Sequence, residues 1–177
     1  AASDVYKRQV LTDTDDNGRT YSDVISEAEA MSGDFTITEI KAPDGYTLNS
    51  NPTKVTVGKS GAIRTFTNAR NQTVKATKVW NDGDNQDGKR PDKVTVHLNK
   101  TVGGVTSIVS SHELTVAENW TYDFTNLPKY ENGQAVAYSV TEDTVATYDA
   151  PVITGDQASG FTITNSRTPE TTSDQTH

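Results

Sequence analysis

The chain has 177 residues, of which 32% are hydrophobic and 7% aromatic, and its formal net charge is −8 at pH 7. Nucleic acids and anionic membranes are polyanions, so this acidic balance disfavours both as partners. The chain has no cysteine, which excludes disulfides, thiol catalysis and cysteine-ligated metal sites.

The first nine residues differ in character from the rest of the chain. Residues 4–9, DVYKRQ, match what one frame of a transposase mosaic-end adapter, used in preparing DNA libraries, would encode. We therefore predict that residues 1–9 are a non-native, adapter-derived segment and exclude them from reasoning about the fold. A native basic N-terminus is the alternative. On the adapter interpretation, the first domain has lost its opening strands.

Residues 10–70 are predicted to be the C-terminal part of a small β domain. In residues 33–40, apolar side chains alternate with Thr, which is the period of a half-buried strand. The sequence APDGY at 42–46 carries Pro and Gly and is predicted to be the turn that ends this strand. Two further strands are expected at 54–57 and 65–68.

The sequence TDTDDNG at residues 12–18 allows two interpretations. Its Asn-Gly pair supplies the positive φ angles of a tight hairpin turn. Asp13, Asp15 and Asn17 also match the first, third and fifth positions of a calcium-binding loop. Val24 occupies the twelfth position, where such a loop carries a glutamate, so we expect a hairpin and no metal site.

A second pattern of strands extends over residues 71–168. Alternating apolar residues predict about seven short strands, separated by polar or Gly-containing turns and without convincing helices. This pattern is typical of an antiparallel β-sandwich. Residues 169–177 are polar and are predicted to be a linker or tail.

Both predicted domains contain a strand that ends in glutamate and, further along, a strand that ends in asparagine. These residues are Glu39 and Asn68 in the first domain and Glu142 and Asn165 in the second. Strand parity turns Glu142 toward the core, where a carboxylate is costly unless it is neutral or paired. The shared order indicates a divergent tandem repeat, which suggests a stalk.

Parity places Lys78 and Asn165 on the inward face of the second domain together with Glu142. Burial should lower the pKa of the lysine and raise that of the glutamate, so that a neutral amine and a neutral acid coexist. Aromatic neighbours such as Trp80 and Tyr138 are expected to keep the site dry. The amine of Lys78 could then attack the side-chain amide of Asn165, assisted by Glu142, and release ammonia in a single-turnover step. The alternative is an ordinary buried ion pair between Lys78 and Glu142.

The motifs of the second domain resemble those of a known family. Residues 72–168 resemble a Cna B-type domain of Gram-positive surface adhesins and pilins. The resemblance is carried by KVWND at 78–82, NQDGKRP at 85–91, LPKY at 127–130, YSVTED at 138–143 and FTITN at 161–165.

The first domain resembles the C-terminal part of a SpaA-type, prealbumin-like domain. The matching motifs are GDFTITEIKAPDGYTL at 33–48 and FTNA at 66–69. Glu39 and Asn68 match the family's assisting and acceptor residues, but no lysine lies on a matching opening strand. We therefore expect both residues to be vestigial, with no crosslink in this domain and a marginal fold.

These resemblances imply an all-β chain of tandem Ig-like antiparallel β-sandwich domains, the first truncated at its N-terminus. In the family, an isopeptide bond joins the first and last strands of a domain. The resemblance therefore implies that Lys78 and Asn165 are crosslinked and that Glu142 assists the reaction.

The function that follows is a structural stalk module of a cell-wall-attached adhesin or pilin outside the cell. Neighbouring repeats would be its partners, and no cofactor or metal is expected; the anchor is expected outside this segment. The alternative is a ligand-binding module that recognises host protein or carbohydrate, for which residues 81–91, Tyr130 and Tyr148 are candidates. An enzyme acting on an external substrate is disfavoured because the three histidines are scattered.

Overall fold

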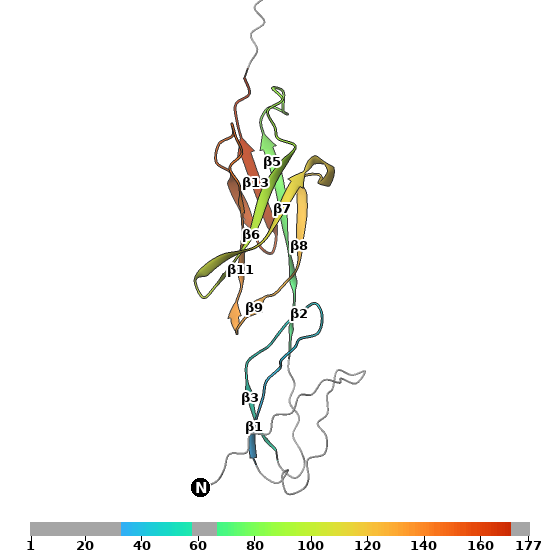
Figure 1. Cartoon of the computed structure of the whole chain (residues 1–177), viewed down its shortest axis with the longest axis vertical. Helices are drawn as coiled ribbons and strands as arrows, with labels where there is room; N and C mark the ends of the chain where they lie inside the picture. Colours follow the sequence, from blue (N-terminus) through green and yellow to red (C-terminus); the bar gives the residue numbers. More distant parts are fainter. Residues whose placement is uncertain (1–32, 58–66, 171–177) are drawn as a thin grey trace, which may run out of the picture. The chain divides into compact units, whose positions relative to one another are not determined.

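The computed structural model describes residues 33–57 and 67–170, and most of the regular structure in them is β-strand (Figure 1). The described residues belong to two compact units, one with residues 33–38 and 52–57 and the other with residues 39–51 and 67–170. In this part of the chain, no helix has the length and hydropathy needed to cross a membrane. The predicted adapter-derived segment and the 12–18 turn lie outside the described residues.

The first unit contains a pair of antiparallel strands, β1 (Gly33–Ile37) and β3 (Thr53–Val57). Both strands were predicted from alternation, although β1 ends before Glu39. The Glu39 carboxylate instead accepts hydrogen bonds from Asn68 and from the backbone N–H of Asn49, in the second unit. Of the apolar side chains on this pair, Val55 is buried and Phe35 is exposed.

The second unit is a β-sandwich of two sheets, which confirms the predicted all-β class (Figure 1). In the four-stranded sheet the order is β12-β13-β5-β8, and in the three-stranded sheet it is β11-β6-β7. The first sheet contains β5 (Gln72–Asn81), β8 (Thr121–Leu127), β12 (Val152–Asp156) and β13 (Gly160–Ser166). The second contains β6 (Lys93–Val102), β7 (Val105–Thr115) and β11 (Ala137–Glu142).

One pairing within these sheets is parallel, in an otherwise antiparallel sandwich. The first strand, β5, lies beside the last strand, β13, and the two run in the same direction. A hairpin cannot join parallel neighbours. Here the rest of the domain forms the connection, so residues far apart in the sequence face one another.

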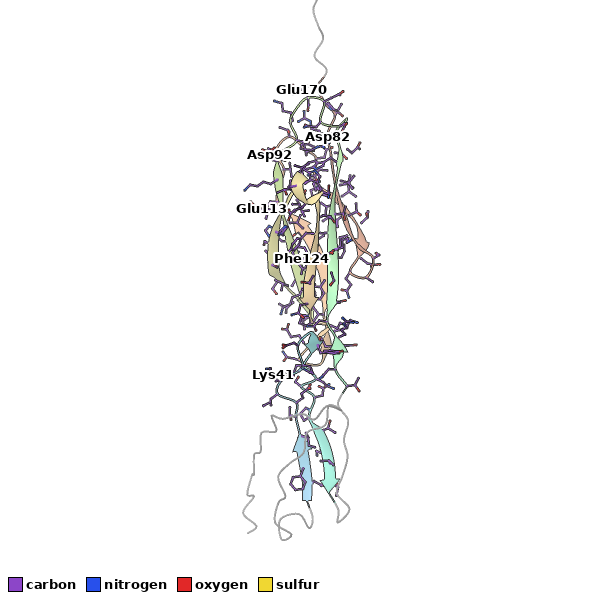
Figure 2. All side chains as sticks on the ribbon, turned by 90° about the vertical axis from the view of Figure 1, so that its right-hand side faces the viewer. Lys41, Asp82, Asp92, Glu113, Phe124 and Glu170 are labelled. Atoms are coloured by element: carbon purple, nitrogen blue, oxygen red, sulfur yellow. The ribbon has the colours of Figure 1, made fainter. Side chains whose placement is uncertain are left out.

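The core lies between the two sheets and is built from alternate residues of their strands. The predicted inward face of β11 is confirmed by the burial of Tyr138 and Val140, and Val136, just before the strand, is buried as well. Phe124 of β8 is buried in the middle of this unit (Figure 2). The other buried apolar residues of the cluster are Val74, Ala76, Val94, Val96, Leu98, Leu114, Leu127, Phe161 and Ile163.

Tight turns connect several strands. Gly103 and Gly104 both have positive φ angles and join β6 to β7. Asn132 and Gly133 make the same kind of turn between β9 (Tyr130–Glu131) and β10 (Gln134–Ala135). Positive φ at both central positions matches the right-handed twist of the strands, which is why Asn and Gly occupy these sites. A single 3₁₀ turn, η1 (Val116–Glu118), lies between β7 and β8.

The strand predicted at 65–68 is wrong in its described part, because Thr67 and Asn68 are not in a strand. A two-residue strand, β4 (Ala69–Arg70), follows instead and pairs with β2 (Tyr46–Thr47). The buried Thr47 hydroxyl donates to the side chain of Asn71 and accepts from the backbone N–H of Lys129. These bonds tie the turn at 42–46 and the β2–β4 pair to the sandwich.

Candidate functional site

The three residues singled out in the second domain meet in its interior. Lys78 Nζ donates a hydrogen bond of 2.8 Å to Asn165 Oδ1 and lies 3.6 Å from Glu142 Oε1. The side chains of Lys78 and Glu142 are fully buried, with 0% of each exposed, and Asn165 is buried as well. An amine, an amide and a carboxyl group therefore share one dry pocket of the core.

The parallel pairing of β5 and β13 brings Lys78 to Asn165. Its register places Lys78 opposite Ile163 and Trp80 opposite Asn165. Lys78 and Asn165 are thus diagonal neighbours on one face of the sheet. Along β5, Val74, Ala76 and Lys78 alternate inward, so the lysine occupies a core position.

Glu142 reaches the same point from the other sheet. It is the last residue of β11, where it pairs with Val96 of β6. Its inward parity, shared with Tyr138 and Val140, carries the carboxyl group across the sandwich to Lys78. The site is therefore made by three strands from two sheets.

Several polar atoms of the site have no hydrogen-bond partner. The amine of Lys78 also donates to the carbonyls of Val79 and Ile163, at 3.2 and 3.3 Å. Both carboxyl oxygens of Glu142 and the Nδ2 of Asn165 are buried without a hydrogen bond of normal geometry, although Lys78 and Asn165 lie close enough to favour the charged form of Glu142. Each such group costs about 1–3 kcal/mol, so this arrangement needs a chemical explanation.

Burial moves the pKa values of Lys78 and Glu142 toward their uncharged forms. Loss of water lowers the pKa of Lys78 from 10.5 to about 8, although the nearby Glu142 opposes the shift. Loss of water likewise raises the pKa of Glu142, against the opposing effect of Lys78. Both directions agree with the expectation from the sequence.

Trp80 covers the amine of Lys78, with 4.0 Å between Nζ and the centre of the indole ring. An aromatic face favours an ammonium ion by about 0.5–2 kcal/mol. The pKa of Lys78 is nevertheless lowered, so the loss of water outweighs this attraction. The other aromatic residue expected nearby, Tyr138, is buried in the core, where its hydroxyl donates to the carbonyl of Pro128.

The structure also brings Glu39 and Asn68 together. Asn68 Nδ2 donates a hydrogen bond of 2.7 Å to Glu39 Oε1, and the Oδ1 of Asn68 is buried without a partner. Among the described residues, neither side chain bonds to a lysine. The pair therefore has the acid and the amide of the second-domain site without its amine.

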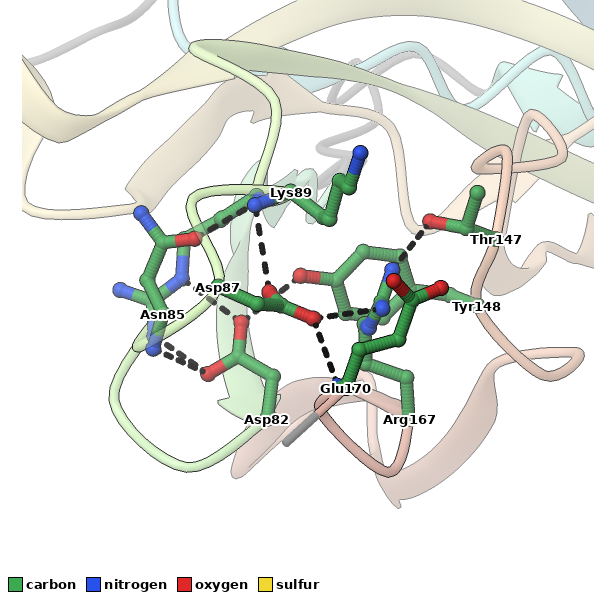
Figure 3. A network of polar contacts seen from close by, with 9 residues as sticks. Asp82, Asn85, Asp87, Lys89, Thr147, Tyr148, Arg167 and Glu170 are labelled. Carbon is green, nitrogen blue, oxygen red and sulfur yellow. Dashed lines mark hydrogen bonds and ion pairs between the residues drawn. The ribbon is translucent and has the colours of Figure 1, made fainter. Parts of the chain in front are cut away.

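Sequence reasoning missed a polar network around Asp82 (Figure 3). Asp82 is only 1% exposed and accepts two hydrogen bonds from the guanidinium of Arg90, at 2.7 and 3.0 Å. The hydroxyl of Tyr148 donates to the same carboxylate at 2.7 Å. Arg90 holds the pKa of Asp82 well below its usual range. The motifs at 78–82 and 85–91 include Asp82 and Arg90, but a motif alone does not tell which acid is buried.

The same network holds the segment that follows β13. Arg167 donates to Asp87 at 2.6 Å, with both side chains less than 10% exposed, and the backbone N–H of Glu170 donates to the same carboxylate (Figure 3). Most of residues 81–91 are exposed, as the sequence suggested, but Asp82 is buried and Asp87 is partly buried. These two acids and Tyr148 are engaged in contacts within the domain.

The histidines of the described residues make separate contacts. His97 bonds to Ser111 and Asp143, whereas His112 bonds to Glu118 and stacks on Tyr122. Within residues 33–57 and 67–170, no group of three or more His, Asp or Glu side chains has the arrangement of a metal site.

The sandwich and its motifs define a class of protein. Residues 74–166 match the family model for the Cna protein B-type domain, and residues 4–73 match that for a prealbumin-like fold domain, SpaA. The chain belongs to the Cna B-type family and carries a SpaA-type domain before the B-type domain. Its relatives include a surface adhesin.

Particular relatives come from two organisms. The chain is 36% identical over 163 residues to the collagen adhesin of Staphylococcus aureus. This match covers 92% of the chain and 12% of the length of the relative. The solved B1 repeat unit of the S. aureus collagen-binding surface protein is 43% identical, with a TM-score of 0.48 over 56% of this chain and 48% of the other. The pilus adhesin SpaC from Lactobacillus rhamnosus GG is 26% identical, with a TM-score of 0.47 over 73% of this chain and 17% of the other.

Proposed function

We propose that the chain is a structural stalk module of a Gram-positive surface adhesin or pilin, located outside the cell and attached to its wall. Its second domain closes an intramolecular isopeptide bond between Lys78 and Asn165, with Glu142 as the assisting acid. The observation that carries this proposal is the convergence of an amine, an amide and an acid in the dry interior. The collagen adhesin and the pilus adhesin among the relatives support the stalk context.

The reaction joins two side chains and releases one ammonia. The lone pair of the neutral Lys78 amine attacks Cγ of Asn165, which is bonded to the Oδ1 that the amine already contacts. Protonated Glu142 donates a hydrogen bond to that oxygen and stabilises the negative charge that develops on it, until the carbonyl re-forms. Glu142 then takes a proton from the attacking nitrogen and delivers it to Nδ2, which leaves as ammonia. One C–N bond forms, one breaks, and Glu142 ends in its starting state.

The contacts and burial of the Glu142 carboxyl group suit it to this proton relay. Its carboxyl group lies 3.6 Å from the amine of Lys78 and interacts with Asn165, so it can exchange protons with both reacting groups. Burial raises its pKa, which favours the protonated acid that the first step requires. The same burial supplies Lys78 with a lowered pKa and hence a neutral amine. Burial therefore favours the uncharged, reactive forms of both Lys78 and Glu142.

The position of the bond matters for a stalk. Tension that enters the domain at β5 and leaves at β13 would shear these two parallel strands apart. A covalent link between Lys78 and Asn165 carries that load directly from one strand to the other. The sheets between them are then never pulled, and the domain keeps its length under force.

We propose that the first domain forms no isopeptide bond. Glu39 and Asn68 are vestigial there, because the acid and amide lack a lysine partner among the described residues. The chain therefore forms one crosslink and not two.

The test is the intact mass of the full chain under denaturing conditions. The parent should be lighter than its sequence by the mass of one ammonia, and Lys78→Met should have its full mass. Lys75→Met, which removes an exposed lysine from the same strand, is the matched control and should keep the deficit. Full mass in the folded parent would overturn the crosslink. A deficit of two ammonia molecules would overturn the vestigial role of Glu39 and Asn68.

A further inference from the structure

Trp80 is held in place by aromatic neighbours. The indole ring packs edge-on against Trp120 and Tyr148, with ring centres 5.2 and 5.0 Å apart. Trp80 follows Lys78 by two residues in β5, so the ring lies on the same side of the sheet as the amine. Arg90 approaches the ring as well, with its guanidinium carbon 5.6 Å from the ring centre.

Two of these neighbours depend on one buried carboxylate. Asp82 Oδ2 accepts hydrogen bonds from the hydroxyl of Tyr148 and from Nε of Arg90, and Oδ1 accepts from Nη2 of Arg90. The backbone N–H of Asn85 donates to Oδ1 as well, which fixes the carboxylate itself (Figure 3). Asp82 thus connects the loop after β5, the loop that holds Tyr148 and the cover of the crosslinking site.

We propose that Asp82 is a positioning residue for the crosslinking reaction: through Tyr148 and Arg90 it holds Trp80 over the amine of Lys78 and keeps water away from it. The inference rests on the proposed function, because it concerns the rate of that reaction. Asp82 does not touch the reacting atoms. It acts through the aromatic ring that does.

Several charged groups surround the amine of Lys78, but burial affects its pKa more than any of them does. Glu142 faces the amine from β11, and the Asp82–Arg90 ion pair lies in the loop that follows β5. Asp82 raises the pKa of Lys78 and Arg90 lowers it, so loss of the Asp82 charge by itself would lower this pKa, opposite to the effect of water entry. Tyr148 packs edge-on against Trp80, and the guanidinium carbon of Arg167 lies 5.6 Å from the centre of the Tyr148 ring. Burial is the largest influence on Lys78, and the indole ring is part of what buries it.

Loosening this cover should therefore change how the reaction depends on pH. If water reaches the amine, the pKa of Lys78 returns toward 10.5 and less of the neutral nucleophile is present at neutral pH. A carboxylate that merely stabilises the loop would slow the reaction by the same factor at every pH. The pH profile separates these two roles.

The experiment follows crosslinking in chains that start without the bond. Full chains are assembled from synthetic segments in denaturant, refolded by dilution at a series of pH values around 8, and sampled for intact mass over time. In the parent, the rate should rise with pH as Lys78 loses its proton, with the midpoint of the rising limb near the pKa of Lys78, about 8, and fall again where Glu142 loses the proton that the first step requires. In Asp82→Asn the entry of water should outweigh the loss of the pKa-raising carboxylate, so the midpoint should move upward by about one pH unit, which makes the reaction about tenfold slower at neutral pH.

Two further variants keep the test decisive. Tyr148→Phe removes only the hydroxyl that bonds to Asp82, and it should shift the midpoint in the same direction by less; it replaces Asp82→Asn if that variant does not fold. Glu113→Gln breaks the exposed ion pair with Lys93, which involves none of the residues around Trp80, and should keep the parent midpoint. An unchanged midpoint in the Asp82 and Tyr148 variants would overturn the positioning role. A parent that never loses ammonia would instead overturn the proposed function.

Discussion

The stability that the proposed crosslink gives to the second domain can be predicted from the structure. Glu142→Gln keeps the shape of the side chain but removes the acid that relays protons. Lys78→Met removes the amine and leaves an apolar chain of similar length. Both variants should fold without the bond, and they disturb the packing of the site in different ways. A loss of stability shared by the two variants therefore measures the crosslink itself.

The expected loss follows from the length of chain that the bond closes. Lys78 and Asn165 are 87 residues apart in the sequence. By the loop-closure relation used for disulfides, a crosslink of this span stabilises the folded state by about 4–5 kcal/mol, mainly by restricting the unfolded chain. For a domain of this size, the melting temperature should fall by roughly 20–35 °C in either variant.

Differential scanning calorimetry measures this change, and intact mass on the same samples confirms the state of the bond. Lys75→Met serves again as the control, because its lysine is exposed and it should melt with the parent. The reasoning is refuted if Glu142→Gln retains the ammonia deficit at the parent's rate. It is also refuted if both variants lack the bond and yet melt within a few degrees of the parent.

Two other predictions concern force and pH. Under a pulling force, Lys78→Met should unfold with roughly 300 Å of extra chain, since the 86 residues between the linked positions are released; a parent that extends by the same length would contradict the load-bearing role. In Asn165→Ala the amine stays free, and its folded-state pKa of about 8 lies below its ordinary 10.5. The unfolded state then binds more protons between these values, so the stability of this variant relative to the parent should rise by up to about 3 kcal/mol as the pH increases from about 8 to 10.5. Urea unfolding across this window measures the effect, and a constant difference from the parent would contradict the lowered pKa.

The sequence by itself determined which residues of the second domain face the core. Alternation along β5, β11 and β13 placed Lys78, Glu142 and Asn165 inward, and all three side chains are buried. It also determined the turn at Gly103 and Gly104, because positive φ angles at two successive positions are a local property of the chain. Such features depend on residues within a few positions of one another.

Only the tertiary structure decided which of these inward residues meet. Parity does not reveal that β13 lies parallel to β5, or that Glu142 approaches from the opposite sheet, because strand order is set by packing between distant segments. For the same reason, the sequence suggested an exposed loop where Asp82 is buried: Arg90 and Tyr148, which lie 8 and 66 positions away, supply its partners. Local alternation in the sequence determines which face of a strand a side chain occupies, whereas its spatial neighbours depend on how the whole chain folds.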